Sequence, residues 1–220
     1  MTGPKAFVFD AYNTLFDVYS VQASCEEVFP GYGEKLTRLW RTKQLEYSWL
    51  RSLMGRYEDF WKLTGDGLRY SCRFLGLQPE ATQLETIMQS YLTLAAFPET
   101  THVLDGLAGQ PRAILSNGNP AMLEAVVRHN GLEGKFDHIL SVDVLKIYKP
   151  HPSVYQLAVD RLGLSREEIG FVSSNGWDVA GAKAFGFQVF WLNRLEAPVE
   201  ELGVQPDAII KSALELLDLS

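Results

Sequence analysis

The chain of 220 residues is 46% hydrophobic and 21% charged, a balance that can fill one large domain or a core with a subdomain. Its formal net charge of −7 argues against nucleic acid or an anionic membrane surface as a partner, because both need clustered lysine and arginine. No stretch approaches a membrane span of about 20 apolar residues, and the first apolar run stops at Asp10, so we expect no signal peptide.

The first predicted element is a short strand, Ala6-Phe7-Val8-Phe9, which Asp10 follows directly. The segment from residue 17 to residue 97 contains no convincing strand, and its apolar residues recur at helical spacing. They are Leu36, Leu39, Trp40, Tyr47, Leu50 and Met54 in one helix and Ile87, Tyr91 and Leu94 in a second. Thr64-Gly65-Asp66-Gly67 and Gly76-Leu77-Gln78-Pro79 are expected to interrupt the helices. We therefore expect an all-helical insert that acts as a lid over a ligand site.

From residue 100 onward, strand-like apolar runs alternate with helical patterns, which is typical of βαβ units around a parallel sheet. The predicted strands are 112–116, 138–142, 169–173, 188–192 and 207–210. The predicted helices between them are 121–129, 153–162 and 179–185. The predicted fold class is α/β: a Rossmann-like parallel sheet core with helices on both faces, formed by 1–16 and 98–220, and an inserted all-helical cap subdomain, 17–97.

Polar or charged residues follow several of these apolar runs. Asp10 follows the first, Ser116-Asn117 ends the second, Lys149 lies beyond the third, and a cluster from Ser173 to Asp178 follows the fourth. Because the carboxyl ends of parallel strands lie along one edge, where ligands bind, we expect these groups to meet in one crevice. A carboxylate there can attack carbon or phosphorus and form an ester. A lone aspartate could equally cap a loop, but the accompanying clusters favour the catalytic interpretation.

Four segments in this order resemble the successive motifs of the haloacid dehalogenase superfamily, and most of all those of its L-2-haloacid dehalogenase branch. They are Phe9-Asp10-Ala11-Tyr12-Asn13-Thr14-Leu15, Leu115-Ser116-Asn117-Gly118, Lys149-Pro150-His151-Pro152-Ser153-Val154-Tyr155 and Val172-Ser173-Ser174-Asn175-Gly176-Trp177-Asp178. The resemblance runs through essentially the whole chain, including the helical insert. Any one motif alone would be weak, whereas four in order at plausible spacings are a strong indication.

Two departures from the superfamily's commoner phosphatase pattern distinguish the branches. Phosphatases of this kind carry a second aspartate two residues after the nucleophile, where this chain has Tyr12. They also carry an acidic magnesium ligand four residues before the last aspartate, where this chain has Ser174. A magnesium site needs its carboxylates, so we expect neither a metal nor any other cofactor. A halide needs no proton to leave, and both departures suit displacement at carbon.

The resemblance implies hydrolytic dehalogenation of L-2-haloalkanoic acids to D-2-hydroxyacids with inversion. Asp10 would attack C2 and expel the halide, and water would then attack the carboxyl carbon of the Asp10 ester. The implied catalytic residues are Asp10, Thr14, Arg41, Ser116, Lys149, Tyr155, Ser173, Asn175 and Asp178. The implied substrate-binding residues are Ala11, Tyr12, Arg41, Leu45, Phe60, Ser116, Asn117 and Trp177.

Lys149 would keep Asp10 ionised through its positive charge, although a lysine beside a proline is also an ordinary surface residue. Ser116 and neighbouring backbone N–H groups would hold the substrate carboxylate near a helix N-terminus, or Ser116 would act as a cap. Asn117 and Arg41 would receive the departing halide, because arginine stabilises an anion that develops in the transition state. From composition alone, Arg41 would instead be a solvated residue on a helix face.

Asp178 would position or deprotonate the hydrolytic water, with Ser173 and Asn175 orienting it. Asp178 could instead pair with Lys149 and act only as an organiser, and the sequence leaves both roles open. Thr14 and Tyr155 would be supporting hydrogen-bond donors. Tyr12, Leu45, Phe60 and Trp177 would form an apolar wall around the substrate, although aromatic residues at helical spacing, such as Phe60, usually belong to a core.

Two other functions compete with dehalogenation: a phosphatase of the same fold, which Tyr12 and Ser174 oppose, and a non-catalytic binding relative, which intact Asp10, Lys149 and Asp178 oppose. The expected partners are a small 2-haloacid and water, with neither nucleic acid nor membrane, and the resemblance implies a homodimer. Cys25 and Cys72 form neither a metal motif nor a disulfide framework, so we expect reduced thiols in a cytoplasmic protein.

Overall fold

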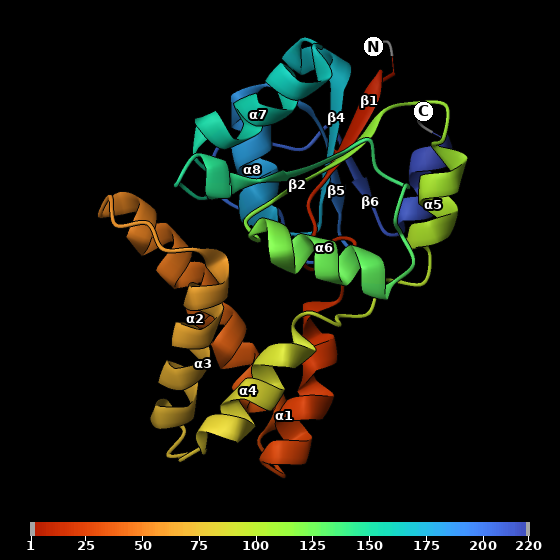
Figure 1. Ribbon diagram of the computed structural model, residues 1–220. Coiled ribbons are helices and arrows are strands. Elements are labelled where there is room, and N and C mark those ends of the chain that lie inside the picture. The colour runs from red at the N-terminus through yellow and green to blue at the C-terminus, as the bar shows by residue number, and fades with distance from the viewer. Residues whose placement is uncertain (1–2, 219–220) are drawn as a thin grey trace.

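Residues 3–218 are described by the computed structural model. Six strands pair side by side in the order β3-β2-β1-β4-β5-β6, and every pair is parallel (Figure 1). The strands are β1 Ala6–Phe9, β2 Arg112–Ser116, β3 His138–Ser141, β4 Ile169–Ser173, β5 Gln188–Leu192 and β6 Ala208–Ile210. All four residues of the central strand β1 are apolar and buried. This is expected for a strand that helices cover on both faces of the sheet.

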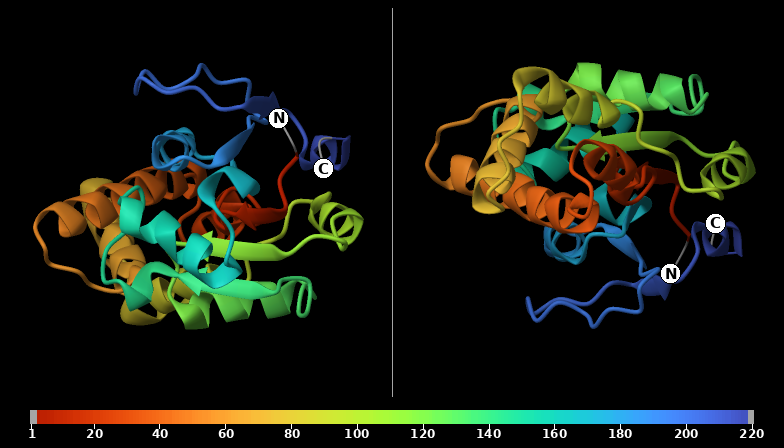
Figure 2. Two further views of the ribbon diagram at one scale, coloured as in Figure 1. Left: turned by 90° about the horizontal axis from the view of Figure 1, so that it is seen from above. Right: turned by 90° about the horizontal axis from the view of Figure 1, so that it is seen from below.

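Helices cover both faces of the sheet, which confirms the predicted α/β class (Figures 1 and 2). They are α5 Thr100–Gly106, α6 Pro120–His129, α7 Pro152–Leu162 and α8 Gly176–Phe185. Helices α7 and α8 pack against each other on one face, and α5 and α6 lie on the opposite face. Helix α8 begins three residues before its predicted start at Val179, and α5 lies in a region where the sequence patterns predicted no helix.

The chain changes direction across the sheet at β1. From β1 it builds β2 and β3 on one side, and from β3 it crosses back to build β4 and β5 on the other. Phe9 is aligned with Ile114 of β2 and Val172 of β4. The residues that follow these strands therefore emerge together at the carboxyl edge of the sheet, at the switch point where open α/β sheets bind ligands.

The segment between β1 and α5 is helical, as predicted. It contains a 3₁₀ turn, Val18–Val21, and four helices, α1 Gln22–Val28, α2 Gly33–Leu53, α3 Phe60–Phe74 and α4 Ala81–Ser90. The two chain segments that join it to the sheet run side by side, since Asp17 N donates to Ala95 O at 2.8 Å and Phe97 N donates to Leu15 O at 3.0 Å. These helices lie beyond the edge at which β1 ends (Figure 1).

The expectation that Thr64-Gly65-Asp66-Gly67 interrupts a helix is wrong, because these residues lie inside α3. A Cβ atom at Gly67 would stand 3.2 Å from the backbone N of Gln44 and 3.3 Å from Trp40 Cδ1. Glycine therefore lets α3 approach the backbone of α2 closely, and this packing outweighs its low helix propensity. The second predicted interruption is confirmed, since α3 ends at Phe74 and Gly76 has a φ of +72°.

Helix α4 ends before two residues that the sequence pattern assigned to it. Tyr91 caps its end and Leu94 lies beyond it, yet both side chains are buried. Their apolar spacing thus reflects burial in a turn rather than a helical face. Within residues 3–218, no helix combines the length and apolarity that crossing a bilayer requires.

Candidate active site

The carboxylate of Asp10 lies at the centre of the buried polar cluster beyond the sheet edge. Its backbone N donates to Val172 O at 2.9 Å, which extends the pairing of β1 with β4 by one residue. Oδ2 accepts hydrogen bonds from Thr14 Oγ1 at 3.0 Å and Asn175 Nδ2 at 2.8 Å, and Oδ1 lies 3.0 Å from Lys149 Nζ. Asp10 is only 5% exposed. These three donors fix the orientation of both carboxylate oxygens.

Lys149 lies between two carboxylates. Its Nζ is 3.0 Å from Asp10 Oδ1 and 2.9 Å from Asp178 Oδ2, and its side chain is fully buried. Asn117 holds the lysine loop against the end of β2, because its Oδ1 accepts from Lys149 N at 3.0 Å. Burial alone would lower the pKa of Lys149, but the charges of Asp10 and Asp178 outweigh it and raise the pKa above its ordinary value. The lysine therefore carries a proton at neutral pH.

Asp178 is placed by the first turn of α8 and points back into the same cluster. Tyr155 Oη donates to its Oδ1 at 2.8 Å, and Lys149 binds the other oxygen. Burial raises the pKa of Asp178 to about 6, the nearby charge of Asp10 adds to this rise, and Lys149 and Tyr155 oppose it. Removing Lys149 from this cluster would leave two buried carboxylates without a counter-charge, and breaking a buried ion pair in this way typically costs about 3–5 kcal/mol.

Thr14 links the nucleophile loop to the loop after β4. Its hydroxyl donates to Asp10 Oδ2 and accepts from Ser174 N at 2.9 Å. Asn175 makes a second link, because Nδ2 also donates to Tyr12 O at 2.9 Å. The Oγ atom of the predicted residue Ser173 accepts from Asn175 N at 3.1 Å and so orients the asparagine.

Ser116 lies at the end of β2, and its hydroxyl accepts from Gly118 N at 3.1 Å. This is the local capping contact that the sequence left open as an alternative. The contact shapes the turn from Ser116 to Gly118, whose carbonyl also accepts from Ser141 Oγ at 2.6 Å. The serine hydroxyl and Asn117 thus lie at the same sheet edge as Asp10.

Arg41 of α2 does not lie on a fully solvated helix face. The side chain is half-buried, and its Nη1 donates to Gln44 Oε1 at 2.6 Å. Gln44 is fully buried and also accepts from Tyr91 Oη at 2.9 Å. The positive charge of Arg41 opposes the rise in the pKa of the Tyr91 and Tyr12 phenols. Tyr91 in turn packs against Tyr12 of the nucleophile loop at 5.5 Å between ring centroids.

Aromatic side chains from the helical segment cover the nucleophile loop. The ring of Tyr12 stacks on Phe60 of α3 at 5.6 Å between centroids and contacts Tyr91 at 5.5 Å. Phe60 is thus both a core residue and part of the cover of the site. Trp177 meets Trp49 of α2 edge to face at 5.5 Å. Ala11 is buried beside Asp10, and Leu45 is half-buried on α2.

Arg194 is a site residue that the sequence analysis missed. It follows β5, and its guanidinium donates to Ser174 Oγ at 3.0 Å and to Thr14 O at 3.1 Å. It also pairs with Glu99 at 2.7 Å, so it ties the segment entering the helical insert to the segment leaving it. The position of Arg194 just after β5 could have indicated its location, because residues that follow parallel strands meet at the ligand edge of the sheet, as Asp10 does. Gln44 and Tyr91 carried no comparable pattern.

The donor set beside Asp10 does not suit a divalent cation. Ser174 stands where a carboxylate ligand would be needed, and its hydroxyl is bound by the positive guanidinium of Arg194 at 3.0 Å. Within residues 3–218, no three histidine, cysteine, aspartate or glutamate side chains form a cluster able to hold a metal ion.

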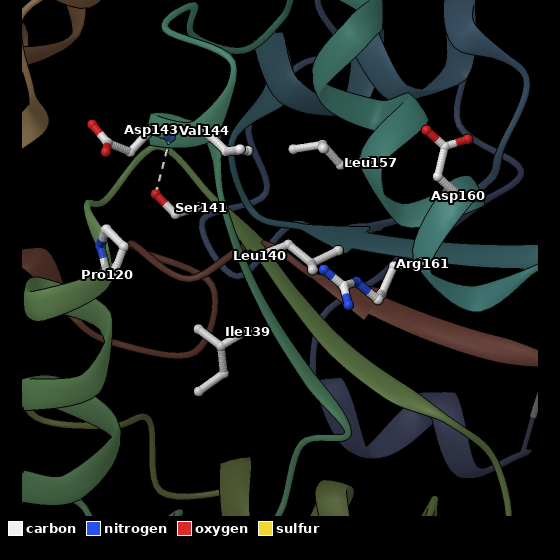
Figure 3. Close-up of a pocket in the computed structure, with 9 residues that line it drawn as sticks. All are labelled: Pro120, Ile139, Leu140, Ser141, Asp143, Val144, Leu157, Asp160 and Arg161. Atoms are coloured by element: carbon white, nitrogen blue, oxygen red, sulfur yellow. Dashed lines mark hydrogen bonds between the residues drawn. The ribbon is translucent and has the colours of Figure 1, made fainter.

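A surface hollow lies elsewhere, on the outer edge of the sheet. It has a volume of about 690 Å³ and is lined by β3 and α7 residues together with Pro120 and the turn after β3 (Figure 3). Its two carboxylates, Asp143 and Asp160, lie on opposite sides of the hollow (Figure 3). Asp143 is already bound by Tyr57 and Lys146. The hollow therefore contains no convergent catalytic group, and the buried cluster around Asp10 is the stronger candidate.

The switch point of this α/β sheet holds an oriented carboxylate, a buried lysine and a second carboxylate. Together they define an enzyme site for nucleophilic catalysis. The family model for haloacid dehalogenase-like hydrolases matches residues 4–186. The chain belongs to this family.

Similar proteins lie in one branch of it. The chain is 50% identical over 217 residues to an (S)-2-haloacid dehalogenase of Pseudomonas sp. (strain YL), covering 98% of this chain and 94% of that protein. It is 47% identical over 205 residues to haloacetate dehalogenase H-2 of Moraxella sp. (strain B), covering 92% of each. A solved structure of the L-2-haloacid dehalogenase from Xanthobacter autotrophicus with chloropropionic acid covalently bound matches with a TM-score of 0.94, 44% identity and 98% coverage of both chains.

Proposed function

We propose that this protein hydrolyses L-2-haloalkanoic acids to D-2-hydroxyacids with inversion at C2, through an ester on Asp10 and without a metal. The observation that carries the proposal is the environment of Asp10: three donors orient its carboxylate, and one of them is a buried lysine 3.0 Å away. The 50% identity to an (S)-2-haloacid dehalogenase over 98% of the chain supports the substrate class. Tyr12 and Ser174 oppose a phosphatase, which needs a general acid and a metal ligand at these positions.

In the first step, an oxygen of Asp10 attacks C2 of the substrate from the face opposite the halogen. The new C–O bond forms as the carbon–halogen bond breaks, and the bonding pair leaves with the halide, which inverts the carbon. Ser116 and the turn to Gly118 receive the substrate carboxylate. Arg41 and Asn117 stabilise the halide as its charge develops. Ala11, Tyr12, Leu45, Phe60 and Trp177 enclose the alkyl part of the substrate.

In the second step, water attacks the carboxyl carbon of the Asp10 ester. Asp178 accepts a proton from this water, while Asn175, oriented by Ser173, directs it. Lys149 and Thr14 stabilise the oxyanion that forms on the former carboxylate. As the bond between the aspartyl carbon and the ester oxygen breaks, the proton held by Asp178 passes to the departing alkoxide, which releases the D-2-hydroxyacid, regenerates both carboxylates and leaves one oxygen of the water in Asp10.

The helical segment 17–97 acts as a cap subdomain on a core of residues 1–16 and 98–220. Side-by-side linkers at Asp17 and Phe97 support this division, since they leave and rejoin the sheet at its ligand edge. Burial of Asp10 and Lys149 under cap side chains supports a lid that moves to admit substrate. Arg41 is the charged group that the cap contributes to the chemistry.

The protein acts in the cytoplasm as a homodimer. Exposed apolar side chains on the cap, Leu53 and Met54 near the end of α2 and Phe74 at the end of α3, support association through this surface. Cys25 and Cys72 are unpaired, and burial raises the pKa of each thiol to about 11, which suits reduced, unreactive cysteines. Light scattering at several concentrations tests the dimer, and cell fractionation tests the location.

Halide release from L-2-chloropropionate in the presence of EDTA tests the activity directly. We expect full activity after exhaustive chelation, with D-lactate as the product. The D enantiomer of the substrate, chloroacetate and p-nitrophenyl phosphate with magnesium are the comparison substrates. Loss of activity on chelation that magnesium restores, or faster turnover of the phosphate ester, would replace the proposal by the phosphatase. Binding of the haloacid without any turnover would instead indicate a non-catalytic relative.

The rate of ester hydrolysis should depend on the ionisation of Asp178. In the free enzyme the pKa of Asp178 is raised to about 6 by burial and in part by the charge of Asp10, which the ester no longer carries, so the midpoint of ester hydrolysis should lie below that value. As the pH falls through this midpoint, Asp178 gains a proton and can no longer accept one from water. We expect hydrolysis to slow by about tenfold per pH unit below the midpoint. In Tyr155→Phe the ionised form loses a hydrogen bond, so the midpoint should move to higher pH.

Single-turnover decay of the ester, followed by rapid quench across the pH range, measures this midpoint. Tyr70→Phe, a change of a remote cap tyrosine, serves as the matched control and should leave the midpoint unaltered. If ester hydrolysis in the wild type were independent of pH, Asp178 would not act as the base and would only orient Lys149.

A further inference from the structure

The hydroxyl of Tyr12 is a buried donor without a partner in the described structure. Its Oη is shielded from solvent, yet no hydrogen-bond acceptor lies within reach. Buried hydroxyl groups are nearly always paired, and an unpaired one at a catalytic site calls for a functional explanation. The neighbouring phenol of Tyr91 shows the contrast, because it is equally buried and donates to Gln44 Oε1 at 2.9 Å.

The ring of Tyr12 is held in one place, so the hydroxyl cannot turn toward another partner. Phe60 stacks on one side of the ring and Tyr91 packs at 5.5 Å. A Cβ atom at Gly118 would stand 2.7 Å from Tyr12 Oη, so the absence of a side chain at this glycine leaves room for the hydroxyl. The fixed ring therefore aims its hydroxyl at the turn that follows Asn117.

The charged groups around this hydroxyl are those assigned to the halide and the nucleophile. Arg41 and Asp10 both lie close enough for their charges to act on the phenol. Asn117, the other proposed halide contact, precedes the glycine that the hydroxyl touches. Burial raises the pKa of Tyr12 well above its ordinary value, so the phenol keeps its proton throughout the reaction. A fixed, protonated donor beside a cation suits an anion better than an apolar wall does.

We propose that Tyr12 is a catalytic residue whose hydroxyl donates a hydrogen bond to the departing halide, together with Arg41 and Asn117. This inference rests on the proposed dehalogenation. The C–X bonding pair leaves with the halide as an Asp10 oxygen bonds to C2, and the phenolic proton stays on Tyr12. The unpaired donor thus acquires its partner only when the anion forms, which is the condition for transition-state stabilisation.

Tyr12→Phe tests the role by removing one oxygen and keeping the stacked ring. We expect ester formation from L-2-chloropropionate to slow by about 10- to 100-fold, as for loss of a hydrogen bond to a charged group. The loss should be smaller with the bromo substrate and smallest with the iodo substrate, because larger halides accept hydrogen bonds more weakly. Hydrolysis of the ester should be unaltered, since the halide has left. Rapid-quench kinetics with the three substrates separates the two steps.

Stability gives a second, independent readout. Because the hydroxyl has no protein partner, Tyr12→Phe should unfold at the same or a higher temperature than the wild type. Tyr148→Phe is the matched control, since that buried hydroxyl donates to Glu58 O at 2.5 Å. We expect this control to unfold at a lower temperature while the ratio of chloride to bromide rates stays at the wild-type value.

Three results would overturn the inference while the wild type still releases halide. They are an unaltered rate of ester formation in Tyr12→Phe, an equal loss with all three halogens, and a lower unfolding temperature. An equal loss would assign the hydroxyl to the substrate carboxylate, and a lower unfolding temperature would assign it a structural partner. Failure of the wild type to release halide would instead refute the proposed function itself.

Discussion

Asp10→Asn should abolish turnover, with halide release below about one hundredth of the wild-type rate, because a neutral amide is a far poorer nucleophile than a carboxylate. The substitution keeps the shape of the side chain, and its carbonyl oxygen can still accept hydrogen bonds. Asp10 is one of two carboxylates that contact Lys149, so the variant retains the pairing with Asp178. The loss should therefore arise from chemistry rather than from unfolding, and thermal unfolding of the variant checks this.

Single turnover in heavy-oxygen water gives an independent measure of the role of Asp10. The label should enter Asp10 first and reach the product only in later turnovers, because water attacks the ester at the aspartyl carbon. Asp105→Asn, on an exposed aspartate of α5, is the matched control and should retain full activity. Retention of substantial activity in Asp10→Asn, once deamidation is excluded by mass spectrometry, would refute the nucleophilic role. Label found wholly in the first product would mean that water attacks C2 directly.

Arg41→Ala should slow ester formation by about 100- to 1,000-fold and leave ester hydrolysis close to the wild-type rate. The halide departs only in the first step, so a cation that stabilises the developing anion contributes there. Arg41 lies on α2, half-buried and bonded to Gln44 at 2.6 Å. The variant therefore also tests whether the helical segment completes the active site. Rapid-quench measurement of the Asp10 ester separates the two steps.

Arg38→Ala is the matched control for this prediction. Arg38 lies three residues before Arg41 on the same helix, but its side chain is 69% exposed and pairs with Glu34 on the helix surface. The control removes the same charge from the same element at a solvated position, so we expect both steps to proceed normally. If Arg41→Ala formed the ester normally and hydrolysed it slowly, the halide contact would be wrong. Normal kinetics in both steps would make Arg41 a structural residue of the cap.

The predictable parts of this protein depend on local patterns. Strands β2, β4 and β5 begin and end where their apolar runs do, because a buried parallel strand must be apolar along its length. The strand pattern also predicts that Asp10, Lys149 and Asp178 lie together, because parallel strands present their carboxyl ends to one crevice. The distances of 3.0 and 2.9 Å from Lys149 Nζ agree with that expectation. Tyr12 and Ser174 can also be identified in the sequence itself, and they oppose phosphatase chemistry without any structural information.

The tertiary structure decided what depends on packing between distant segments. Thr64 to Gly67 form a helix because glycine lets α3 approach α2, a contact that no local propensity contains. Arg41 is half-buried because it bonds to Gln44, which also accepts from Tyr91, and Tyr91 packs against Tyr12 of the nucleophile loop. Arg194 donates to Thr14 O and pairs with Glu99, which lie 180 and 95 residues earlier in the sequence. The absence of a partner for the Tyr12 hydroxyl is likewise evident only in the folded chain. The sequence by itself thus determined which reactive groups meet at the sheet edge. The fold determined which hydrogen bonds these groups make and left the hydroxyl of Tyr12 without a partner, because both depend on three-dimensional contacts.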